Sequence, residues 1–384
     1  MKILLVSSGS GSRGGGEIFL NYLGGALAAR GHSVITWMPA HARMNELASQ
    51  CARFSRVVRT DFRNTYDYRS RPLATLLNSR TSNSIARQWA ELQPDIVHIN
   101  KQNLEDGLDL LRAARVSGRP SICTIHLTQT ARYLRARGAL LRDVVSWWEL
   151  RKFEGDFVAV QDIRRNELSS FLGSRARTKT IFNGVPQVDL RQKHALRSSM
   201  RAQLNIADNQ LLVVGLGRLV PQKRPFVFLE TAKKLYEQYP HARFAWVGDG
   251  ELSAEWQAAI ARNGLSGAVL WTGWKSDVRP YLAAADLLLH TAEYEGLPFA
   301  LIEAMSMGVP CAISRSVASE LPFLNSRNAI FYDDPGRLEH AICHPQALRE
   351  VGEAGLALVG ERFSDHAMAA SYERLYTEQM ASSG

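Results

Sequence analysis

Short apolar runs alternate with amphipathic segments of helical length along this chain of 384 residues. Such alternation is typical of βαβ units and predicts parallel sheets. In the first half it predicts strands at residues 2–7, 33–38, 95–99, 121–126, 157–160 and 178–182. Helices are predicted between them at residues 17–30, 72–92, 104–117, 140–153 and 162–172.

A turn signal, Asn183-Gly184-Val185-Pro186, separates two stretches of this pattern, and we place the domain boundary there. A polar segment follows to about residue 200. The second alternation predicts strands at residues 211–216, 243–247, 269–271, 287–290 and 310–314, and Ser364 can cap a last helix to about residue 380. We therefore expect an α/β protein of two doubly wound domains, with ligands in the cleft at the carboxyl ends of their strands.

Length and composition fit this division. The chain exceeds one typical domain, and 46% of its residues are apolar, which is ample for two cores. The apolar run at residues 1–6 is too short for a secretory signal, and no run reaches the roughly 18 apolar residues of a membrane span. Cys51, Cys123, Cys311 and Cys343 form no CxxC pair. We expect a cytoplasmic protein with these thiols as small buried side chains.

The charge of the chain is divided unevenly. Residues 1–190 contain 27 Lys and Arg against 16 Asp and Glu, a net charge of +11, and the remainder contains 19 against 21, a net charge of −2. The first half is therefore expected to meet an anionic partner, either an acidic membrane surface or a phosphorylated acceptor, and less readily nucleic acid. A merely solvated basic face is the alternative.

The segment Glu295-Gly296-Leu297-Pro298-Phe299-Ala300-Leu301-Ile302-Glu303 is the most informative part of the sequence. Pro298 suits the first position of a helix, which places Glu303 on that helix and Glu295 in the loop before it. A helix N-terminus offers unpaired N–H groups to a diphosphate, and carboxylates beside it can accept hydrogen bonds from sugar hydroxyls. The alternative is a solvent-facing Glu303 and an ordinary loop glutamate.

A glycine-rich loop follows the first predicted strand and contains Gly9, Gly11, Gly14 and Gly16. The first three match the G-x-G-x-x-G dinucleotide pattern. That pattern also expects an acidic residue at the end of the second strand, where residues 36–39 read Thr-Trp-Met-Pro. A nicotinamide cofactor is therefore disfavoured, and the loop is interpreted as a close backbone approach to a phosphate or sugar.

Arg218 and Lys223 follow the first strand of the second domain, five residues apart. Two fixed cations there suit a diphosphate, although solvated loop cations are the alternative. His126 and His98 end two neighbouring strands of the first domain and are either ligand-facing or structural. No spacing of His, Cys and carboxylates suggests a metal site.

Cations and large apolar residues are interleaved in residues 132–148, which include Arg132, Arg135 and Arg137 and end in Trp147-Trp148. An interfacial membrane segment has this composition, although core packing of the tryptophans is an equal alternative. Arginines also crowd residues 53–87, but no recognition helix or zinc spacing accompanies them. Nucleic-acid binding is not expected.

Together these motifs resemble the family-four retaining glycosyltransferases of GT-B architecture over nearly the whole chain. The matching pieces are, in order, Gly15-Gly16-Glu17; residues 30–34; residues 95–98; His126; residues 183–185; Gly217-Arg218 with Lys223; residues 248–250; and Glu295 through Glu303. The resemblance implies an acceptor-binding domain at residues 1–185, a domain for the nucleotide-sugar donor at 186–363, and a C-terminal helix at 364–384 that packs back on the first domain.

The resemblance also implies roles for single residues. Arg218 and Lys223 would hold the donor diphosphate, Glu303 the ribose, and Glu295 the transferred sugar. Residues near these positions are expected to complete the donor site: His126 at the sugar, Gly16 at the phosphates or acceptor, Gly296, Leu297, Phe299 and Ala300 beside the sugar, and Gly273 and Trp274 at the base. The donor would be a UDP- or GDP-sugar, with no metal and no other cofactor.

The acceptor implied is an anionic bacterial glycan or glycolipid, such as a lipopolysaccharide or exopolysaccharide precursor. Arg132, Arg135 and Arg137 would contact it or the cytoplasmic face of the inner membrane. Three departures from the family pattern concern the choice of substrate: Arg224-Pro225 where a glycine is common, Asn100 where a second histidine is frequent, and Pro186 where an aspartate often follows. A nicotinamide-dependent oxidoreductase and a non-catalytic sugar-nucleotide-binding protein are the rival functions.

Overall fold

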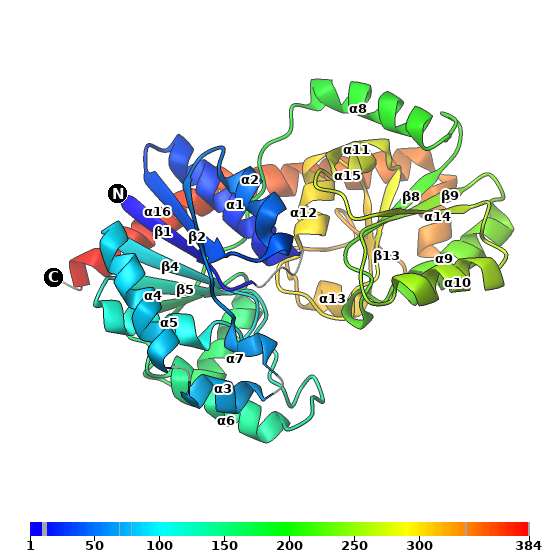
Figure 1. Ribbon diagram of the computed structural model, residues 1–384. Helices are drawn as coiled ribbons and strands as arrows, with labels where there is room; N and C mark the ends of the chain where they lie inside the picture. The colour runs from blue at the N-terminus through cyan, green and yellow to red at the C-terminus, as the bar shows by residue number, and fades with distance from the viewer. Residues whose placement is uncertain (10–13, 69, 78, 335, 383–384) are drawn as a thin grey trace. The chain divides into compact units, whose positions relative to one another are not determined.

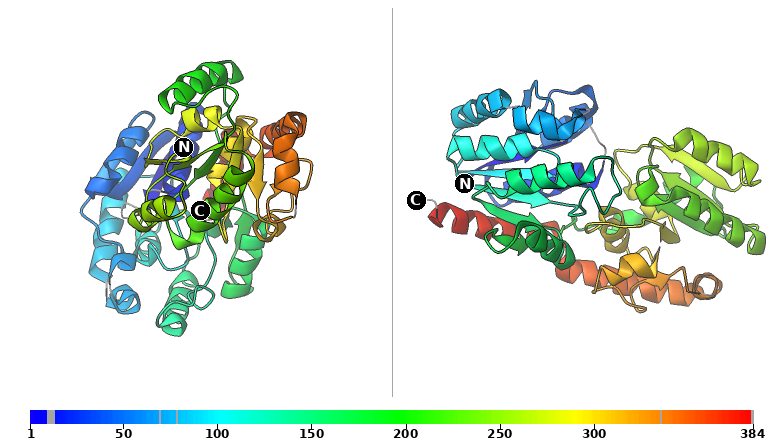
Figure 2. Two further views of the ribbon diagram at one scale, coloured as in Figure 1. Left: turned by 90° about the vertical axis from the view of Figure 1, so that its right-hand side faces the viewer. Right: turned by 90° about the horizontal axis from the view of Figure 1, so that it is seen from below.

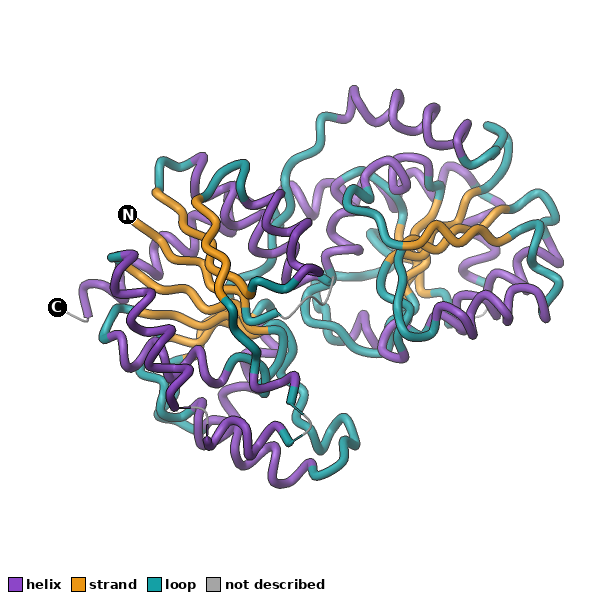
Figure 3. The backbone as a smooth tube through the Cα atoms, viewed as in Figure 1, coloured by secondary structure: helices purple, strands orange, loops and turns teal. Residues whose placement is uncertain are grey.

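The computed structural model describes residues 1–9, 14–68, 70–77, 79–334 and 336–382. The chain forms two compact units, the first made of residues 1–184 and 365–384 and the second of residues 185–364. Each unit is a parallel sheet with helices on both faces (Figure 1; Figure 3, strands in orange). The two doubly wound α/β units confirm the fold class predicted from the sequence.

The sheet of the first unit has the strand order β3-β2-β1-β4-β5-β6-β7, all in parallel. Its strands are β1 (Lys2–Ser7), β2 (Ser33–Pro39), β3 (Arg56–Thr60), β4 (Ile96–Lys101), β5 (Ser121–Ile125), β6 (Asp156–Ala159) and β7 (Thr178–Thr180). The chain moves outward from β1 to β3 and then returns to place β4 on the other side of β1. In such sheets the loops at this reversal diverge and leave room for ligands.

Helices cover both faces of this sheet (Figure 2). They are α1 (Gly15–Ala29), α2 (Asn45–Cys51), α3 (Arg71–Leu77), α4 (Ser79–Leu92), α5 (Leu108–Ser117), α6 (Ala139–Leu150), α7 (Asp162–Leu172) and α16 (Asp365–Ser382). Side chains alternate along β4: Val97 and Ile99 join the core beneath α4 and α5, whereas His98 faces Tyr372 and Tyr376 of α16. The C-terminal helix α16 thus belongs to the first unit, where it packs against α1 and β5.

The second unit has the strand order β10-β9-β8-β11-β12-β13, which reverses between β8 and β11. Its strands are β8 (Leu212–Leu216), β9 (Arg243–Val247), β10 (Val269–Gly273), β11 (Leu287–His290), β12 (Cys311–Ile313) and β13 (Ile330–Phe331). Its helices are α8 (Leu190–Gln203), α9 (Pro225–Gln238), α10 (Ser253–Arg262), α11 (Arg279–Ala284), α12 (Phe299–Ser306), α13 (Arg315–Ser319), α14 (Arg337–Cys343) and α15 (Pro345–Arg362). A core cluster packs Phe228, Trp246 and Trp256 between α9, α10 and the sheet.

Several sequence predictions of secondary structure are wrong in detail. Strand β3 was missed because it is a partly buried edge strand with two arginines, and β13 because it has two residues. The polar segment after the turn at residues 183–186 is helix α8, whose face lies on α11. The helix predicted at 72–92 is two helices, α3 and α4, and the one predicted from residue 104 begins at Leu108 because Gly107 takes a left-handed φ of 58°.

Three of the four cysteines are buried, but Cys343 is exposed, so the expectation of four buried thiols is wrong there. Its sulfur lies 2.9 Å from the hydroxyl of Tyr239 at the surface. In the part of the chain that the structure describes, no helix is long and apolar enough to cross a membrane.

Candidate functional site

The loops after β8 and β11 form the centre of the candidate site in the second unit. These strands are neighbours at the reversal of the strand order, and their loops contain Arg218, Lys223 and Glu295. Three hydrogen bonds join the two loops: Thr291 Oγ1 donates to the Lys223 carbonyl (2.8 Å), Glu293 N to the Gln222 carbonyl (2.8 Å), and Gln222 Nε2 to the Tyr294 carbonyl (2.9 Å). Candidate residues that are about 70 positions apart in the sequence are thereby fixed together.

Close backbone contacts between glycines shape the edge of the sheet beside these loops. Gly217 and Gly248 have φ angles of 149° and 137°, and a Cβ on Gly248 would lie 2.1 Å from the Gly217 carbonyl oxygen. Gly248 N donates to the carbonyl of Gly273, the last residue of β10 (2.9 Å). The indole groups of Trp246 and Trp271 donate to the carbonyls of Gly217 (3.0 Å) and Gly248 (2.8 Å). Backbone contact therefore excludes any side chain at Gly248, and the positive φ angle of Gly217 disfavours one there, which accounts for these glycines of the predicted motifs.

Lys223 and Glu295 form an ion pair, and His290 at the end of β11 lies 3.4 Å from the same carboxylate. Burial by itself would raise the pKa of Glu295, but the Lys223 ammonium, with a smaller contribution from nearby His290, lowers that pKa to about 2. Glu295 is therefore a carboxylate that can accept hydrogen bonds from a ligand but cannot act as a general acid near neutral pH.

Arg218 differs from Lys223 in its surroundings. It is half-buried, and within the described ranges its guanidinium makes no hydrogen bond or ion pair. A planar cation held near a sheet edge without a carboxylate partner retains all its donors for an anionic ligand. Among the described residues, the predicted pair therefore consists of Arg218 without a partner and Lys223, which Glu295 already holds.

Helix α12 begins directly after the Glu295 loop. Gly296, Leu297 and Phe299 are buried there and Ala300 is partly exposed. Pro298 is the residue before the helix, with φ −71° and ψ 119°, so its prediction as the first helical residue is wrong by one position. Glu303 is buried on α12, which contradicts the alternative of a solvent-facing glutamate. Trp274, the predicted base contact, follows β10 and is partly buried.

In the first unit, His126 and Gly16 are linked through Asn100. His126 Nε2 donates to Asn100 Oδ1 (2.8 Å), and Asn100 Nδ2 donates to the Gly16 carbonyl (2.8 Å). A Cβ on Gly16 would lie 2.0 Å from the Gln102 amide, so α1 approaches the loop after β4 as closely as a glycine allows. Burial lowers the pKa of His126 to about 4, so the imidazole is neutral at physiological pH. Of the preceding glycine loop, Gly11 lies outside the described residues.

His98 is a structural residue. Its ring nitrogens lie 2.7 Å from the Tyr376 hydroxyl and 2.8 Å from Thr124 Oγ1, and the side chain is fully buried. Burial, with the nearby His126, lowers the pKa of His98 to about 3. The ligand-facing alternative for His98 is thereby excluded.

A buried charged group that the sequence reasoning missed lies at the reversal between β1 and β4. Lys101 is fully buried, and burial lowers its pKa, whereas burial raises the pKa of Asp106 and raises that of Asp109 to about 7. Asp106 accepts hydrogen bonds from Ser8 Oγ and from Gln102 N (3.0 Å). Asp106 thereby fixes the loop after β1 to the loop after β4. Asn100, which the sequence analysis names, shares one face of β4 with His98, whereas Asp106 lies in the loop after β4, where strand periodicity does not mark it.

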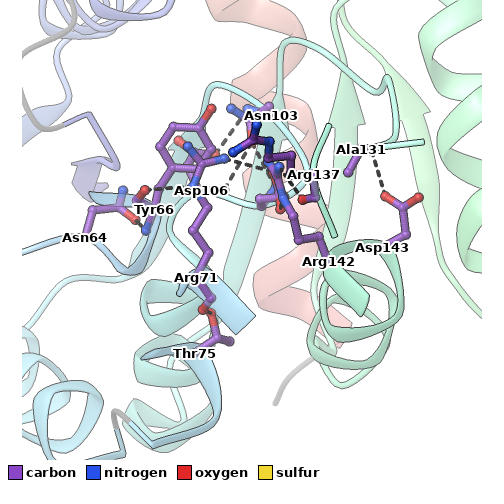
Figure 4. A network of polar contacts seen from close by, with 11 residues as sticks. Asn64, Tyr66, Arg71, Thr75, Asn103, Asp106, Ala131, Arg137, Arg142 and Asp143 are labelled. Atoms are coloured by element: carbon purple, nitrogen blue, oxygen red, sulfur yellow. Dashed lines mark hydrogen bonds and ion pairs between the residues drawn. The ribbon is translucent and has the colours of Figure 1, made fainter. Parts of the chain in front are cut away.

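The basic segment predicted to contact acceptor or membrane lies before and on α6. Arg132 is exposed but pairs with Asp143 (3.2 Å), and Arg135 and Arg137 are exposed. Arg142 points inward: together with Arg71 of α3 it binds Glu105, at 2.7 Å for Arg142 Nε and 3.3 Å for Arg71 (Figure 4). Arg142 is therefore an anchor of the helix pair α3 and α6 and is not part of an exposed cationic face.

Comparisons with known proteins agree with this arrangement. The sequence profile of Glycosyltransferase Family 4 matches residues 13–187, and that of Glycosyl transferases group 1 matches residues 197–321. The chain belongs to the family-four glycosyltransferases. Its two units are the two domains of the GT-B architecture.

Individual relatives show the extent of the likeness. The chain is 28% identical over 228 residues to an Escherichia coli UDP-Gal:α-D-GlcNAc-diphosphoundecaprenol α-1,3-galactosyltransferase, covering 57% of each chain. It is 28% identical over 133 residues to the Rhizobium meliloti lipopolysaccharide core biosynthesis glycosyltransferase LpsE, covering 35% of this chain and 38% of that one. These matches thus span well under two thirds of either relative's length.

Among solved structures, Anabaena HepE in complex with UDP-glucose superposes over the full length of both chains, with a TM-score of 0.77 and 21% identity. Sucrose-phosphate synthase from Thermosynechococcus elongatus matches over 99% of both chains, with a TM-score of 0.76 and 19% identity. At these identities the likeness establishes the shared fold.

Proposed function

We propose that this protein transfers a sugar from a nucleoside diphosphate sugar to an acceptor hydroxyl with retention of anomeric configuration. The observation that carries the proposal is the set of groups at the loops after β8 and β11. These are Arg218, which has no ion-pair partner among the described residues, the Lys223 and Glu295 pair, and the start of α12 directly after Glu295. Two cations and a helix N-terminus suit a diphosphate, and a carboxylate kept ionised suits sugar hydroxyls. The UDP and UDP-glucose complexes of Anabaena HepE support a nucleotide-sugar ligand for this fold.

The proposed reaction breaks the bond between the anomeric carbon and the β-phosphate oxygen and forms a bond from that carbon to the acceptor oxygen. Negative charge develops on the leaving diphosphate, where Arg218, Lys223 and the positive end of α12 stabilise it. The acceptor proton passes to the leaving phosphate on the same face of the sugar, which gives retention without a protein nucleophile. Glu295 orients Lys223 and the sugar. The contact of His126 with the donor sugar stays a prediction.

The decisive experiment is a screen of nucleotide sugars with the full chain, scored by hydrolysis without acceptor and by mass spectrometry of transfer products. One nucleotide sugar is expected to be consumed, and NAD is expected neither to bind nor to react. Inactivity with every sugar nucleotide together with no UDP or GDP binding would contradict the proposal. Binding without turnover would favour a sugar-nucleotide-binding protein.

We further propose that Glu303 binds the nucleotide ribose and Glu295 the transferred sugar. The ribose contact exists with the free nucleotide, whereas the sugar contact needs the intact donor. Titration calorimetry with UDP or GDP should therefore show weakened binding for Glu303→Ala and near-normal binding for Glu295→Gln, which should instead lose turnover. Equal losses of nucleotide affinity in the two variants would contradict this division.

Catalysis is proposed to need no metal, because the protein supplies its own cations at the diphosphate. Turnover in excess EDTA should equal turnover in untreated protein. Activity that disappears with EDTA and returns with Mg²⁺ or Mn²⁺ would refute this part of the proposal.

For the acceptor we propose an anionic bacterial glycan or glycolipid, used by a cytoplasmic enzyme bound peripherally to the inner membrane. Relatives named for lipopolysaccharide and lipid-linked substrates support this assignment. Liposomes with anionic lipid should sediment the wild-type chain at low salt and less of the Arg135→Glu/Arg137→Glu variant. The exposed pair Arg327→Glu/Arg349→Glu in the second unit is the matched control. A wild-type chain that ignores anionic liposomes at low salt would exclude membrane binding.

A further inference from the structure

A groove of about 770 Å³ lies in the first unit between α6 and α7, beside the loop that follows β5. Its apolar wall is formed by Tyr133, Leu140, Val144, Trp147, Ile163 and Phe171. Thr128 and Gln129 line its other end and follow His126 by two and three residues. The groove therefore lies beside the chain segment that continues from His126 and extends along α6 and α7.

Hydrogen bonds and one ion pair fix the walls of this groove. Asp143 of α6 accepts hydrogen bonds from the backbone N–H groups of Ala131 (2.7 Å) and Arg132 (3.2 Å). On the opposite wall, Thr128 Oγ1 donates to Glu167 of α7, which also pairs with buried Arg164 at 2.7 Å. The loop at residues 128–132 is thus held at both helices, and the groove is a formed feature of the unit.

Gln129 is the polar side chain in the groove whose hydrogen bonds are not satisfied. It is 7% exposed, and neither its amide nitrogen nor its amide oxygen has a partner among the residues that the structure describes. Leaving a buried amide unpaired is unfavourable, and such groups are rare in folded proteins unless a ligand or water completes them. The amide can donate to and accept from a ligand hydroxyl or phosphate at this end of the groove.

The α6 side of the groove rim is apolar and its exposed charges are positive, whereas Glu167 on the α7 side is 39% exposed. Leu140, Leu141, Val144 and Trp148 follow helical spacing along α6 and are each half or more exposed. The only acidic residues in the segment 132–152 are Asp143 and Glu149, and both are buried. All the exposed charges of this segment are therefore positive, which complements an anionic amphiphile.

We propose that this groove binds an anionic lipid, with the hydrocarbon chain against Val144, Trp147 and Phe171 and the polar head at Gln129 and Arg132. The proposal rests on the proposed function, in which that lipid carries the acceptor sugar. The head then lies at the end of the groove nearest His126 in the chain, and the hydrocarbon chain leaves along the exposed apolar residues of α6.

The test uses the full chain and farnesyl phosphate, a short anionic isoprenoid, with binding measured by calorimetry below its aggregation concentration. Val144→Trp fills the groove and should weaken binding at least tenfold. Val116→Trp is the matched control, because Val116 is an equally exposed valine on α5 that does not line the groove. Circular dichroism confirms the fold of both variants. Equal binding by Val144→Trp and wild type would overturn the proposal.

Gln129→Leu separates a ligand contact from a structural role. It removes an unpaired buried amide, so the midpoint of thermal unfolding should rise, while binding of farnesyl phosphate should weaken roughly three- to tenfold. Unchanged binding in this variant would overturn the assignment of Gln129. A structural role would instead lower the unfolding midpoint.

Two further measurements separate lipid binding in the groove from general membrane contact and from nucleotide binding. Vesicles of phosphatidylcholine with phosphatidylglycerol test general membrane contact: if they bind and farnesyl phosphate does not, the groove assignment is wrong. Binding of UDP or GDP to the wild-type chain, measured in parallel, tests the proposed function independently. Nucleotide binding without farnesyl phosphate binding contradicts the groove alone, and the reverse result contradicts the donor site alone.

Discussion

Lys223 and Glu295 form an ion pair in which the two side chains are 17% and 8% exposed. The pair exists because the loops after β8 and β11 lie side by side and are joined by three further hydrogen bonds. Lys223 thus has a partner in the folded protein before any ligand binds, whereas Arg218 has none within the described ranges. The two cations should therefore respond differently to mutation.

Arg218→Ala and Lys223→Ala are each expected to reduce sugar transfer roughly 10- to 150-fold, through loss of a charge-assisted contact to the diphosphate. Arg218→Ala should change the free energy of unfolding by less than about 0.5 kcal/mol. Lys223→Ala should cost about 3 kcal/mol or more, because it leaves the buried Glu295 carboxylate without its cation. Urea unfolding and turnover measure both effects, with exposed Arg262→Ala of α10 as control. Near-normal turnover in the double variant would end the phosphate assignment.

Acid should weaken the second unit through Glu295. Its pKa is lowered from 4.5 to about 2 on folding, so its stabilising contribution is complete above pH 4.5 and is lost as the pH falls toward 2. This pKa change corresponds to at most about 3 kcal/mol of the free energy of unfolding. Stability measured from pH 6 to pH 2.5 should therefore fall less steeply in Glu295→Gln than in wild type. Parallel profiles for the two proteins would show that the carboxylate is not held in this way.

The first unit should lose stability at a higher pH because of its two buried histidines. Folding lowers the pKa of His98 from 6.5 to about 3 and that of His126 to about 4. The unfolded chain therefore binds more protons below pH 6.5, and each histidine should cost about 1.4 kcal/mol per pH unit until its folded pKa is reached. His126→Asn should reduce the slope between pH 6 and pH 4.5 by about 1.4 kcal/mol per pH unit, the share of one histidine. An unchanged slope would mean that His126 titrates normally.

Arg224 has a left-handed conformation, with φ 47° and ψ 54°, between the Lys223 turn and Pro225. Glycine tolerates these angles without the strain that a Cβ causes. The loop thus keeps a shape that suits glycine even though arginine occupies the position. Arg224→Gly should raise the free energy of unfolding by up to about 1 kcal/mol, whereas Arg224→Ala should not. Chemical denaturation of both variants measures this, and a gain in Arg224→Ala alone would exclude backbone strain as the cause.

Much of the candidate site could be predicted because local sequence patterns carry it. The segment from Glu295 to Glu303 contains its own loop and helix start, and the placement of one carboxylate in the loop and one on the helix was correct. Gly248 marks a close backbone contact that glycine alone permits, and Gly217 has a positive φ angle that favours glycine. Edge strand β3 escaped prediction because a half-exposed strand with two arginines lacks an apolar run.

The sequence by itself determined the alternation of strands and helices, the two doubly wound units and the order of the motifs, since these depend on hydrophobic periodicity and turn chemistry close along the chain. Only the tertiary structure decided which charged residues are already paired. Lys223 is held by Glu295 and Arg142 by Glu105, while Arg218 stays unpaired among the described residues and Gln129 is buried without a partner. Such distinctions depend on contacts between loops that are distant in the sequence. Their energies are set by burial, which no local pattern encodes.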